Sequence, residues 1–378
     1  MTAVIVAARR SPIGTVGKSL RSVPADQLAA AVLTATADDV RLAAADIDDV
    51  ILGNLMGPGG NTARVAALRA GLGESVPGLT IDRQCASGLE AINLAAAQLA
   101  AGRGHAYLAG GVESPSTAPW RAERPRTPGE PPRFYPRAPF APASYGDPEM
   151  GPAADALAAA AGISRQRQDE YAAASHARAV AAQRSGAFDR EIVPVAGVTT
   201  DDRPRPGFGV GRLSRLPAAF GPGGTATAGN SCGVNDGAAV VAVVSEKWRA
   251  QRWLPGLRIV DWAVAGVDPR RPGFGPVPAI QTLLRRNGLT LDQVSTVEFN
   301  EAFAGQVLAC LDALDLSWQR VCPDGGAIAL GHPWGASGAV LMVRLFSQLI
   351  NKPGAYGLAA IASGGGLGVA TLVRSVSA

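Results

Sequence analysis

The chain has 378 residues, of which 47% are hydrophobic and 17% charged, and its formal net charge is +4. This is an ordinary globular composition, so wholesale disorder is excluded, and the length predicts two domains or two fused halves. No dense basic block with interleaved aromatic residues is present, so we expect no nucleic-acid partner and favour small anionic ligands.

The N-terminus and the cysteines indicate the cellular setting. Only six apolar residues of the opening segment precede Arg9 and Arg10, too few for the core of a signal peptide. No apolar run approaches the length that crosses a bilayer, so we expect a cytoplasmic protein with no membrane partner. The cysteines show neither CxxC nor metal-site spacing, which predicts free thiols and no metal. They are Cys85, Cys232, Cys310 and Cys322.

Strands and helices alternate in the first 115 residues. Residues 3–8 combine small and β-branched side chains as a buried strand does. Pro24 suits the first turn of a helix over 25–40. The other elements expected here are a strand within 46–56, a helix over 61–71, a short β-like run ending at Ile81, a helix that Gly102 ends, and a strand over 105–114. That last strand contains Gly110 and Gly111, which predict a close approach of another backbone segment.

Residues 115–151 are rich in proline and arginine, with isolated aromatic residues. Because proline removes ladder donors, this segment is excluded from a sheet interior. It is either a disordered linker or a long loop ordered against the core, and its aromatic residues favour partial order. Helices are predicted at 152–161 and, beginning after Ser164, at 164–185. The four arginines of 201–217 either clamp phosphate groups or form a solvated face.

The early pattern recurs in the second half. Ser87-Gly88 corresponds to Ser337-Gly338 and Asn54 to Asn300, at an offset of about 250 residues. This predicts a duplicated α/β domain with mainly parallel, buried sheets, whose loops converge on one site. The expected elements are strands at 238–244, at 258–265, after a turn within 290–303, and at 356–362, and helices at 276–287, 304–314 and within 324–349. The expected division is a first half (1–115 and 220–250), an inserted loop domain (116–219) and a second half (251–378).

Cys85 stands where the β-like run meets a helix, among small residues that leave room for a ligand. The unpaired N–H groups of a first helical turn create a positive field, which is expected to lower the thiol pKa below about 8.5. The thiolate is the form that attacks acyl carbons. A packing role is the alternative, because free cysteine is among the most buried residue types.

Two further turns carry candidate chemistry. His332, flanked by glycines, is suited to polarise an acyl oxygen or to activate Cys85, and a satisfied buried histidine is the alternative. Asn300 is suited to hold a water or an oxygen in an oxyanion site, or else is an ordinary strand-end residue. Glu301 either orients one of these side chains or caps a helix.

Eight segments follow one another in a recognisable order and spacing: RQCASGLEAI, GGVES, MGPAAD, SRQRQDEYAAASHARA, FDREIVPV, TAGNSCGVNDGAA, NEAF and GGAIALGHPWGASGA. In these segments the chain resembles the thiolase family, including acetyl-CoA acetyltransferases and 3-ketoacyl-CoA thiolases, over essentially its whole length. The resemblance implies a five-layered α/β/α/β/α fold with duplicated halves and an inserted loop domain, assembled as a homodimer or homotetramer. It also implies no permanently bound cofactor and a coenzyme A thioester as substrate; an acyl-carrier-protein thioester stays open.

The resemblance also implies roles for single residues. In thiolases the cysteine matching Cys85 takes the acyl group as a thioester, and the histidine matching His332 activates it and helps bind the thioester oxygen. The asparagine matching Asn300 positions a water of the enolate oxyanion site. The substrate-binding positions are expected at Met150, Cys232 and Gly365; many thiolases have at Cys232 a serine that contacts the pantetheine arm.

The sequence departs from the family at the second catalytic cysteine, whose position is Ala362 in the turn Ala362-Ser363-Gly364-Gly365-Gly366. In thiolases that cysteine moves a proton at the α-carbon or the coenzyme thiol. Its absence predicts a loss of about 10²–10⁴-fold in Claisen condensation or thiolysis. Ser363 is expected to point elsewhere, because neighbouring residues of an extended segment face opposite ways. Glu149, Cys322 and Asp324 also depart from residues usual in the family.

We therefore favour an acyltransferase that forms an acyl-thioester on Cys85 and has an altered second step. That step is a carbon–carbon bond formation without deprotonation, a decarboxylative condensation, or transfer to a non-carbon acceptor. One alternative is a catalytically silent homologue that binds acyl-CoA or supports a partner. Another is an ordinary 3-ketoacyl-CoA thiolase in which Cys232 or Ser363 is the substitute base.

Overall fold

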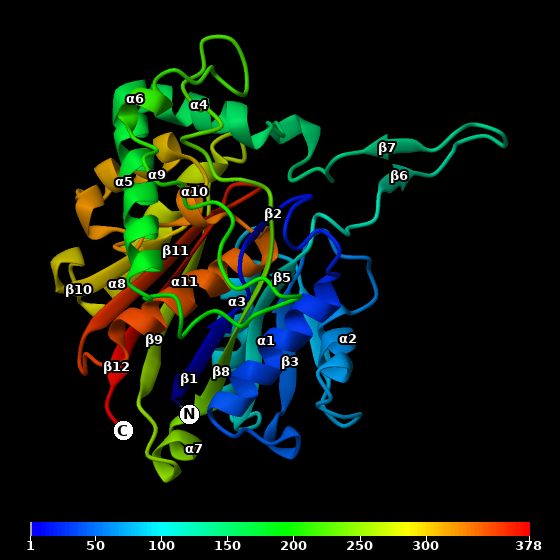
Figure 1. Ribbon diagram of the computed structural model, residues 1–378, viewed down its shortest axis with the longest axis vertical. Helices are drawn as coiled ribbons and strands as arrows, with labels where there is room; N and C mark the ends of the chain where they lie inside the picture. The colour runs from blue at the N-terminus through cyan, green and yellow to red at the C-terminus, as the bar shows by residue number, and fades with distance from the viewer. Residues whose placement is uncertain (1) are drawn as a thin grey trace.

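The computed structural model describes residues 2–378, and its main strands form two sheets joined by a short seam (Figure 1). One sheet has the order β4-β3-β5-β8-β1 and the other β9-β12-β11-β10. The seam consists of two residue pairs between β1 and β9.

The strands are β1 (Ala3–Arg10), β2 (Gly14–Thr15), β3 (Asp49–Gly53), β4 (Gly78–Ile81), β5 (Ala106–Glu113), β6 (Arg121–Glu123), β7 (Arg133–Tyr135), β8 (Asn235–Ser245), β9 (Gly256–Gly266), β10 (Val294–Phe299), β11 (Tyr356–Ser363) and β12 (Leu367–Val376). The α-helices are α1 (Ala25–Asp39), α2 (Thr62–Arg69), α3 (Ser87–Ala100), α4 (Met150–Ala160), α5 (Arg165–Arg184), α6 (Val210–Leu213), α7 (Glu246–Gln251), α8 (Pro276–Asn287), α9 (Ala304–Ala313), α10 (Ala327–Leu330) and α11 (Trp334–Leu349).

Three buried apolar clusters alternate with the two sheets. The first lies under α1 and α2, the second surrounds α3 and α11 between the sheets, and the third lies under α8 and α9. The face of α3 predicted from its apolar spacing is the buried one, since Leu89, Ile92 and Leu99 are each 0% exposed. The five-layered α/β/α/β/α prediction is confirmed.

The two halves repeat one strand order, β3-β5-β8-β1 and β10-β11-β12-β9. In each, the first pair is parallel and the next two are antiparallel, which confirms the predicted duplication. The prediction of mainly parallel sheets was wrong. Only β3 with its two neighbours, and β10 with β11, pair in parallel. The unpredicted β12 follows β11 after the three-glycine turn, and so short a connection permits only antiparallel pairing.

The two central helices touch at glycines near their N-termini. A Cβ on Gly338 would lie 2.5 Å from the amide nitrogen of Leu89, and one on Gly88 would lie 2.7 Å from the carbonyl oxygen of Gly335. The two backbones therefore meet in the first turns of α3 and α11. Cys85 is three residues before Gly88 and His332 is three residues before Gly335, so this crossing brings both turns to the same place.

Gly338→Ala is expected to lower the free energy of unfolding by about 1–3 kcal/mol, because the added methyl group forces the two helices apart. Denaturant unfolding measures this change. The matched control is Gly211→Ala in α6, where an added Cβ meets no atom within 4 Å. The control should change stability by less than about 1 kcal/mol. Equal stability of wild type and Gly338→Ala would contradict the tight crossing.

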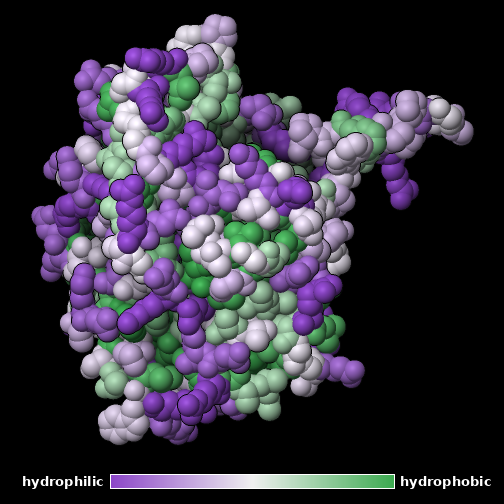
Figure 2. Space-filling model, in the orientation of Figure 1, coloured by the Kyte–Doolittle hydropathy of each residue, from purple (hydrophilic) through white to green (hydrophobic). Residues whose placement is uncertain are grey.

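The segment 115–151 divides into a projecting arm and an ordered loop. β6 and β7 pair only with each other and extend away from the body (Figure 1). Figure 2 shows this arm as a narrow projection with an apolar patch among polar residues. Further along, Arg137 donates to Asp147 at 2.9 Å and stacks on Phe140, whose ring packs against Gly364. The loop therefore reaches the turn that follows β11.

Candidate active site

The turn that carries Cys85 is fixed by hydrogen bonds on both sides of the thiol. Gln84 adopts a left-handed conformation with φ of 51°. The Ser87 hydroxyl accepts from the Arg83 amide at 2.8 Å and donates to the Gln84 carbonyl at 2.6 Å. Ser363 donates its hydroxyl to the Arg83 carbonyl at 2.7 Å. The last bond ties the glycine turn of the second half to the cysteine turn of the first, and it engages the Ser363 hydroxyl with a backbone oxygen.

Cys85 is half-buried, and its thiol is neutral at rest. Burial first, and then the nearby Cys232, raise the pKa of Cys85 to about 12, while the Gly364 amide favours the thiolate. The predicted pKa below about 8.5 was wrong. The loss of hydration outweighs the field of the α3 N-terminus, because the helix starts two residues after the sulfur. Ionisation of Cys85 therefore requires a base within the site.

His332 is a neutral imidazole held by two bonds. Its Nδ1 lies 2.6 Å from the Ser337 hydroxyl, and its amide donates to Asn235 Oδ1 at 3.0 Å. Burial lowers its pKa to about 4. When Nδ1–H donates to Ser337, Nε2 keeps its lone pair for a proton. His332 is thus in the protonation state that a general base requires near neutral pH.

The pH dependence of acylation should follow His332. The rate is expected to be level from about pH 6 to 9 and to fall as the pH drops through about 4, where the imidazole becomes protonated. The folded pKa lies below the ordinary 6.5, so the unfolded chain binds the extra proton between these values and stability falls from about pH 6.5 down to 4. His176 shifts in the same direction. Quenched-flow mass spectrometry across pH measures the acylation rate, and denaturant unfolding across pH measures the stability. An acylation rate that falls near pH 7 would contradict the assignment of its pH dependence to His332.

Asn300 shares a small buried cavity with the histidine's partner. The cavity volume is about 20 Å³, and Glu298, Asn300, Ser337 and Arg344 supply its polar lining. This is room for one water. Within residues 2–378, no hydrogen bond engages the Asn300 side-chain amide, while its backbone N–H donates to Ala360 at 2.9 Å. The amide is therefore available to a small polar guest.

The neighbouring Glu301 has a structural environment. Its carboxylate accepts from the Tyr171 hydroxyl at 2.9 Å, the Ser175 hydroxyl at 2.7 Å and the Ile328 amide at 3.1 Å. These three donors occupy both oxygens. Glu301 therefore anchors α5 and α10 behind the site, and it does not hydrogen-bond to Asn300.

The remaining predicted residues lie around this cluster. The Cys232 amide donates to the Ala302 carbonyl at 2.9 Å, which ties its turn to that of Asn300. Met150 begins α4, where Gly151 packs on Phe220, and Phe220 meets Phe303 edge to face at 5.6 Å.

Gly365 has a φ of 79° and lies against the Phe140 carbonyl. The amide that faces the Cys85 sulfur belongs to Gly364 instead. The sequence analysis missed Gly364, although the adjacent Gly365 was predicted. It also missed a role for Ser337. Because Ser337 is equivalent to Ser87 in the repeated halves of the chain, the repeat could have indicated that role.

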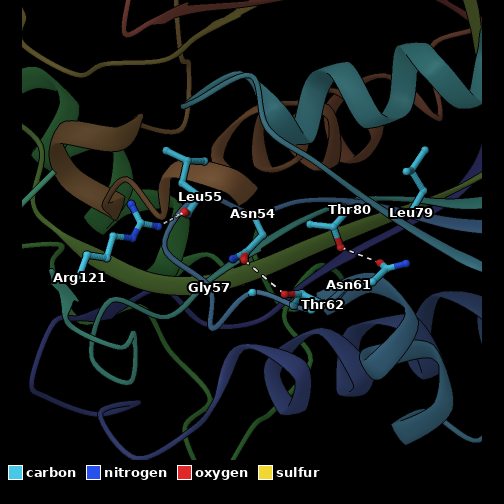
Figure 3. A pocket seen from close by; sticks show the side chains of 10 residues that line it. Asn54, Leu55, Gly57, Asn61, Thr62, Leu79, Thr80 and Arg121 are labelled. Atoms are coloured by element: carbon cyan, nitrogen blue, oxygen red, sulfur yellow. Dashed lines mark hydrogen bonds between the residues drawn. The ribbon is translucent and has the colours of Figure 1, made fainter. Parts of the chain in front are cut away.

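A larger surface hollow of about 500 Å³ lies beside the loop before α2, and none of the predicted site residues lines it (Figure 3). Figure 3 shows Arg121 reaching the Leu55 carbonyl across its rim, with Leu79 of the edge strand β4 at the far side. Asn54 at its floor donates to Glu113 at 3.1 Å, and Glu113 accepts from the Gly335 amide at 3.1 Å. The floor of the hollow is thereby linked to the start of α11.

The chain belongs to the thiolase family. The thiolase N-terminal domain matches residues 3–247, and the thiolase C-terminal domain matches residues 254–375. The protein is an acyltransferase, similar along its whole length to enzymes of that class. A putative acetyl-CoA C-acetyltransferase VraB of Staphylococcus aureus (strain MRSA252) is 42% identical over 377 residues, with 98% of each chain covered. The Staphylococcus haemolyticus (strain JCSC1435) protein of the same name is 41% identical over 380 residues, with the same coverage. The crystal structure of the Bacillus anthracis acetyl-CoA acetyltransferase superposes with a TM-score of 0.92 at 36% identity, covering 99% of both chains.

From residue 2 to residue 378, no helix is long and apolar enough to cross a bilayer. Over the same range, no group of three or more His, Cys, Asp or Glu side chains is placed to hold a metal ion.

Proposed function

We propose that this acyltransferase forms an acyl-thioester on Cys85 from an acyl-CoA. His332 Nε2 takes the proton of the Cys85 thiol, and the thiolate attacks the thioester carbonyl. The tetrahedral intermediate collapses, the C–S bond to coenzyme A breaks, and the departing sulfur takes the proton back from His332. The Gly364 amide beside the sulfur donates to the oxyanion. Asn300 holds a water in the adjacent cavity.

One observation carries this proposal: Cys85 lies at the Gly364 amide, within a cluster whose turns come from both halves of the chain. A neutral thiol with a raised pKa is a strong nucleophile once ionised, and the neutral His332 supplies the base. We propose that the second step differs from that of most thiolases, because the acid and base position is Ala362. Met150, Cys232 and Gly365 are proposed to contact substrate.

Acylation is tested by mixing the protein with acetyl-CoA and measuring the intact mass after an acid quench. The expected result is one added acetyl group per chain, located on the peptide that contains Cys85. Chemical labelling of the other cysteines with iodoacetamide after acetylation provides the internal control. Absence of any adduct at saturating acetyl-CoA would overturn the proposal.

We propose that the chain assembles as a homodimer or homotetramer. β4 is an unpaired sheet edge with Leu79 39% exposed, and Trp120 and Phe134 on the arm are 87% and 58% exposed. A two-stranded hairpin is marginally stable by itself, and such apolar side chains are usually covered by a partner.

Light scattering after size exclusion tests the assembly. We expect Trp120→Ser with Phe134→Ser to lower the mass of the assembly without changing acetylation of Cys85. Arg124→Ser, on the same arm, is the control and should leave the mass unchanged. A monomeric wild-type protein would contradict the proposed assembly, and an unaltered mass in the double variant would exclude the arm as its interface.

A further inference from the structure

Arg203 is a buried arginine without a carboxylate partner among residues 2–378. Its side chain is 9% exposed, and its hydrogen bonds reach only the carbonyls of Ser231 at 3.4 Å and Ile328 at 3.2 Å. Its Nε has no partner. The other buried arginines of the described residues all pair with carboxylates: Arg10 and Arg344 with Glu191, and Arg249 with Glu246. A buried cation left without an anion is costly, so its environment calls for a negative charge at some stage of function.

The group that faces this guanidinium is the Cys232 turn. Arg203 Nη1 occupies the place where a Cβ on Gly233 would stand, and Nη2 bonds to the Ser231 carbonyl. The guanidinium therefore touches the residues on both sides of Cys232. The Cys232 thiol is half-buried and makes no hydrogen bond within the described chain. The hydrogen bond from the Cys232 amide to the Ala302 carbonyl holds this turn beside a residue two positions after Asn300.

The charges around Cys232 are few. Burial raises the pKa of Cys232 to about 12, the Arg203 guanidinium lowers it, and Glu301 raises it. Both oxygens of Glu301 are held by Tyr171, Ser175 and Ile328, so that carboxylate does not pair with Arg203. Arg205 is the second cation that acts on Arg203, and it adds positive charge. A thiolate formed at Cys232 would thus be the anion that Arg203 lacks.

Cys232 also lies close to the nucleophile, since it raises the pKa of Cys85 through space. The side chain at Ala362 ends at a methyl group and has no proton to give. Cys232 is the one other thiol in this cluster of turns, because Cys310 and Cys322 are buried against Gly273 and Phe299.

We propose that Cys232, with Arg203 as its counter-ion, is the acid and base of the second half-reaction, in the place that Ala362 leaves vacant. This rests on the proposed acylation of Cys85. In thiolysis of a 3-ketoacyl-CoA, the Cys85 thiolate attacks the keto carbon and the bond between the α and β carbons breaks. The enolate of acetyl-CoA takes the proton of the Cys232 thiol. Coenzyme A then gives its thiol proton to the Cys232 thiolate and attacks the acyl group on Cys85, and Cys85 regains its proton from His332.

The first test compares two half-reactions in Cys232→Ala and Cys232→Ser. Acetylation of Cys85 by saturating acetyl-CoA should fall far less than thiolysis in both, since its proton goes to His332; loss of a substrate contact at position 232 would lower both half-reactions alike. Thiolysis of acetoacetyl-CoA by coenzyme A should fall by about 10²-fold or more in both, because a serine hydroxyl is too weak an acid. Thiolysis within tenfold of wild type in Cys232→Ala would overturn the proposal, as would a wild-type protein without thiolysis. A missing acetyl adduct in wild type would instead overturn the acylation step.

The second test separates a counter-ion from a packing residue. Arg203→Gln removes the charge and is expected to slow alkylation of Cys232 by iodoacetamide, measured in a Cys85→Ser background, and to move its pH dependence upward. Thiolysis should fall at least tenfold, while Arg203→Lys should recover part of it. The thermal midpoint should stay level or rise, because an unpaired buried charge has been removed. If Arg203→Gln lowered the thermal midpoint but left the rates of Cys232 alkylation and of thiolysis unchanged, Arg203 would be a packing residue and the proposed counter-ion role would be wrong.

Discussion

Cys85→Ala is expected to abolish both the acetyl adduct and every acyl-transfer reaction of the protein. We expect no other thiol to take over as the acyl carrier, because the Gly364 amide lies at Cys85 and because Cys310 and Cys322 are buried. The residual rate should fall by at least about 10⁴-fold, the loss seen when a covalent nucleophile is removed from an otherwise intact site. Coupled spectrophotometric assays and intact-mass measurements record the two quantities.

Cys310→Ala is the matched control for that loss. Cys310 is a buried cysteine of α9 that bonds to the Gly273 carbonyl, outside the cluster of turns. The control should keep the acetyl adduct and lose only stability, by about 1–2 kcal/mol. If Cys85→Ala retained an acetyl adduct on another residue, the assigned nucleophile would be wrong.

Ala362→Cys is expected to restore thiolysis in the Cys232→Ala background by about 10²–10⁴-fold, the usual contribution of a positioned acid and base. Position 362 is half-buried and pairs with Gly368 across the β11–β12 hairpin. The rate of acetoacetyl-CoA thiolysis measures the effect. In the wild-type background the gain should be smaller, since Cys232 already moves the proton.

Two outcomes would contradict this reasoning. A full gain of about 10²–10⁴-fold in the wild-type background would mean that Cys232 contributes nothing. No gain in either background would mean that proton transfer does not limit the second step, as in the silent homologue considered above. Ala362→Ser is the control, since a hydroxyl of similar size has too high a pKa to serve.

Much of the fold followed from patterns that are local in the chain. The helix predicted at 276–287 forms over the same residues, and the helix predicted at 25–40 ends one residue earlier, at Asp39. Apolar spacing, proline at the first turn and glycine at the end are short-range signals. Strand direction was predicted wrongly, because it depends on how β8 and β12 return to the sheet after their connections. The division into the ranges 1–115 with 220–250, 116–219 and 251–378 stays a prediction.

The assignment of Cys85, His332 and Asn300 as site residues stays a prediction. The turns of Cys85 and His332 precede the crossing of α3 and α11, and Asn300 shares a cavity with Ser337, the hydrogen-bond partner of His332. The thiol pKa was predicted with the wrong sign, since the helix field is visible in sequence while the degree of burial is not. Arg203 looked like any exposed arginine in a loose stretch. Only the packed structure shows that its charge is buried and unpaired.

The seam between the sheets has a consequence for biosynthesis. β1 is made before its partners β8 and β9, whose residues begin at 235 and 256. Its pairing with β8 and β9 cannot form until those residues have left the ribosome, and such distant pairing slows folding. A nascent chain therefore carries an apolar strand without its sheet partners until β8 has been made. We expect chaperones to bind this N-terminal strand during translation, and the acyl-transfer site to be completed last.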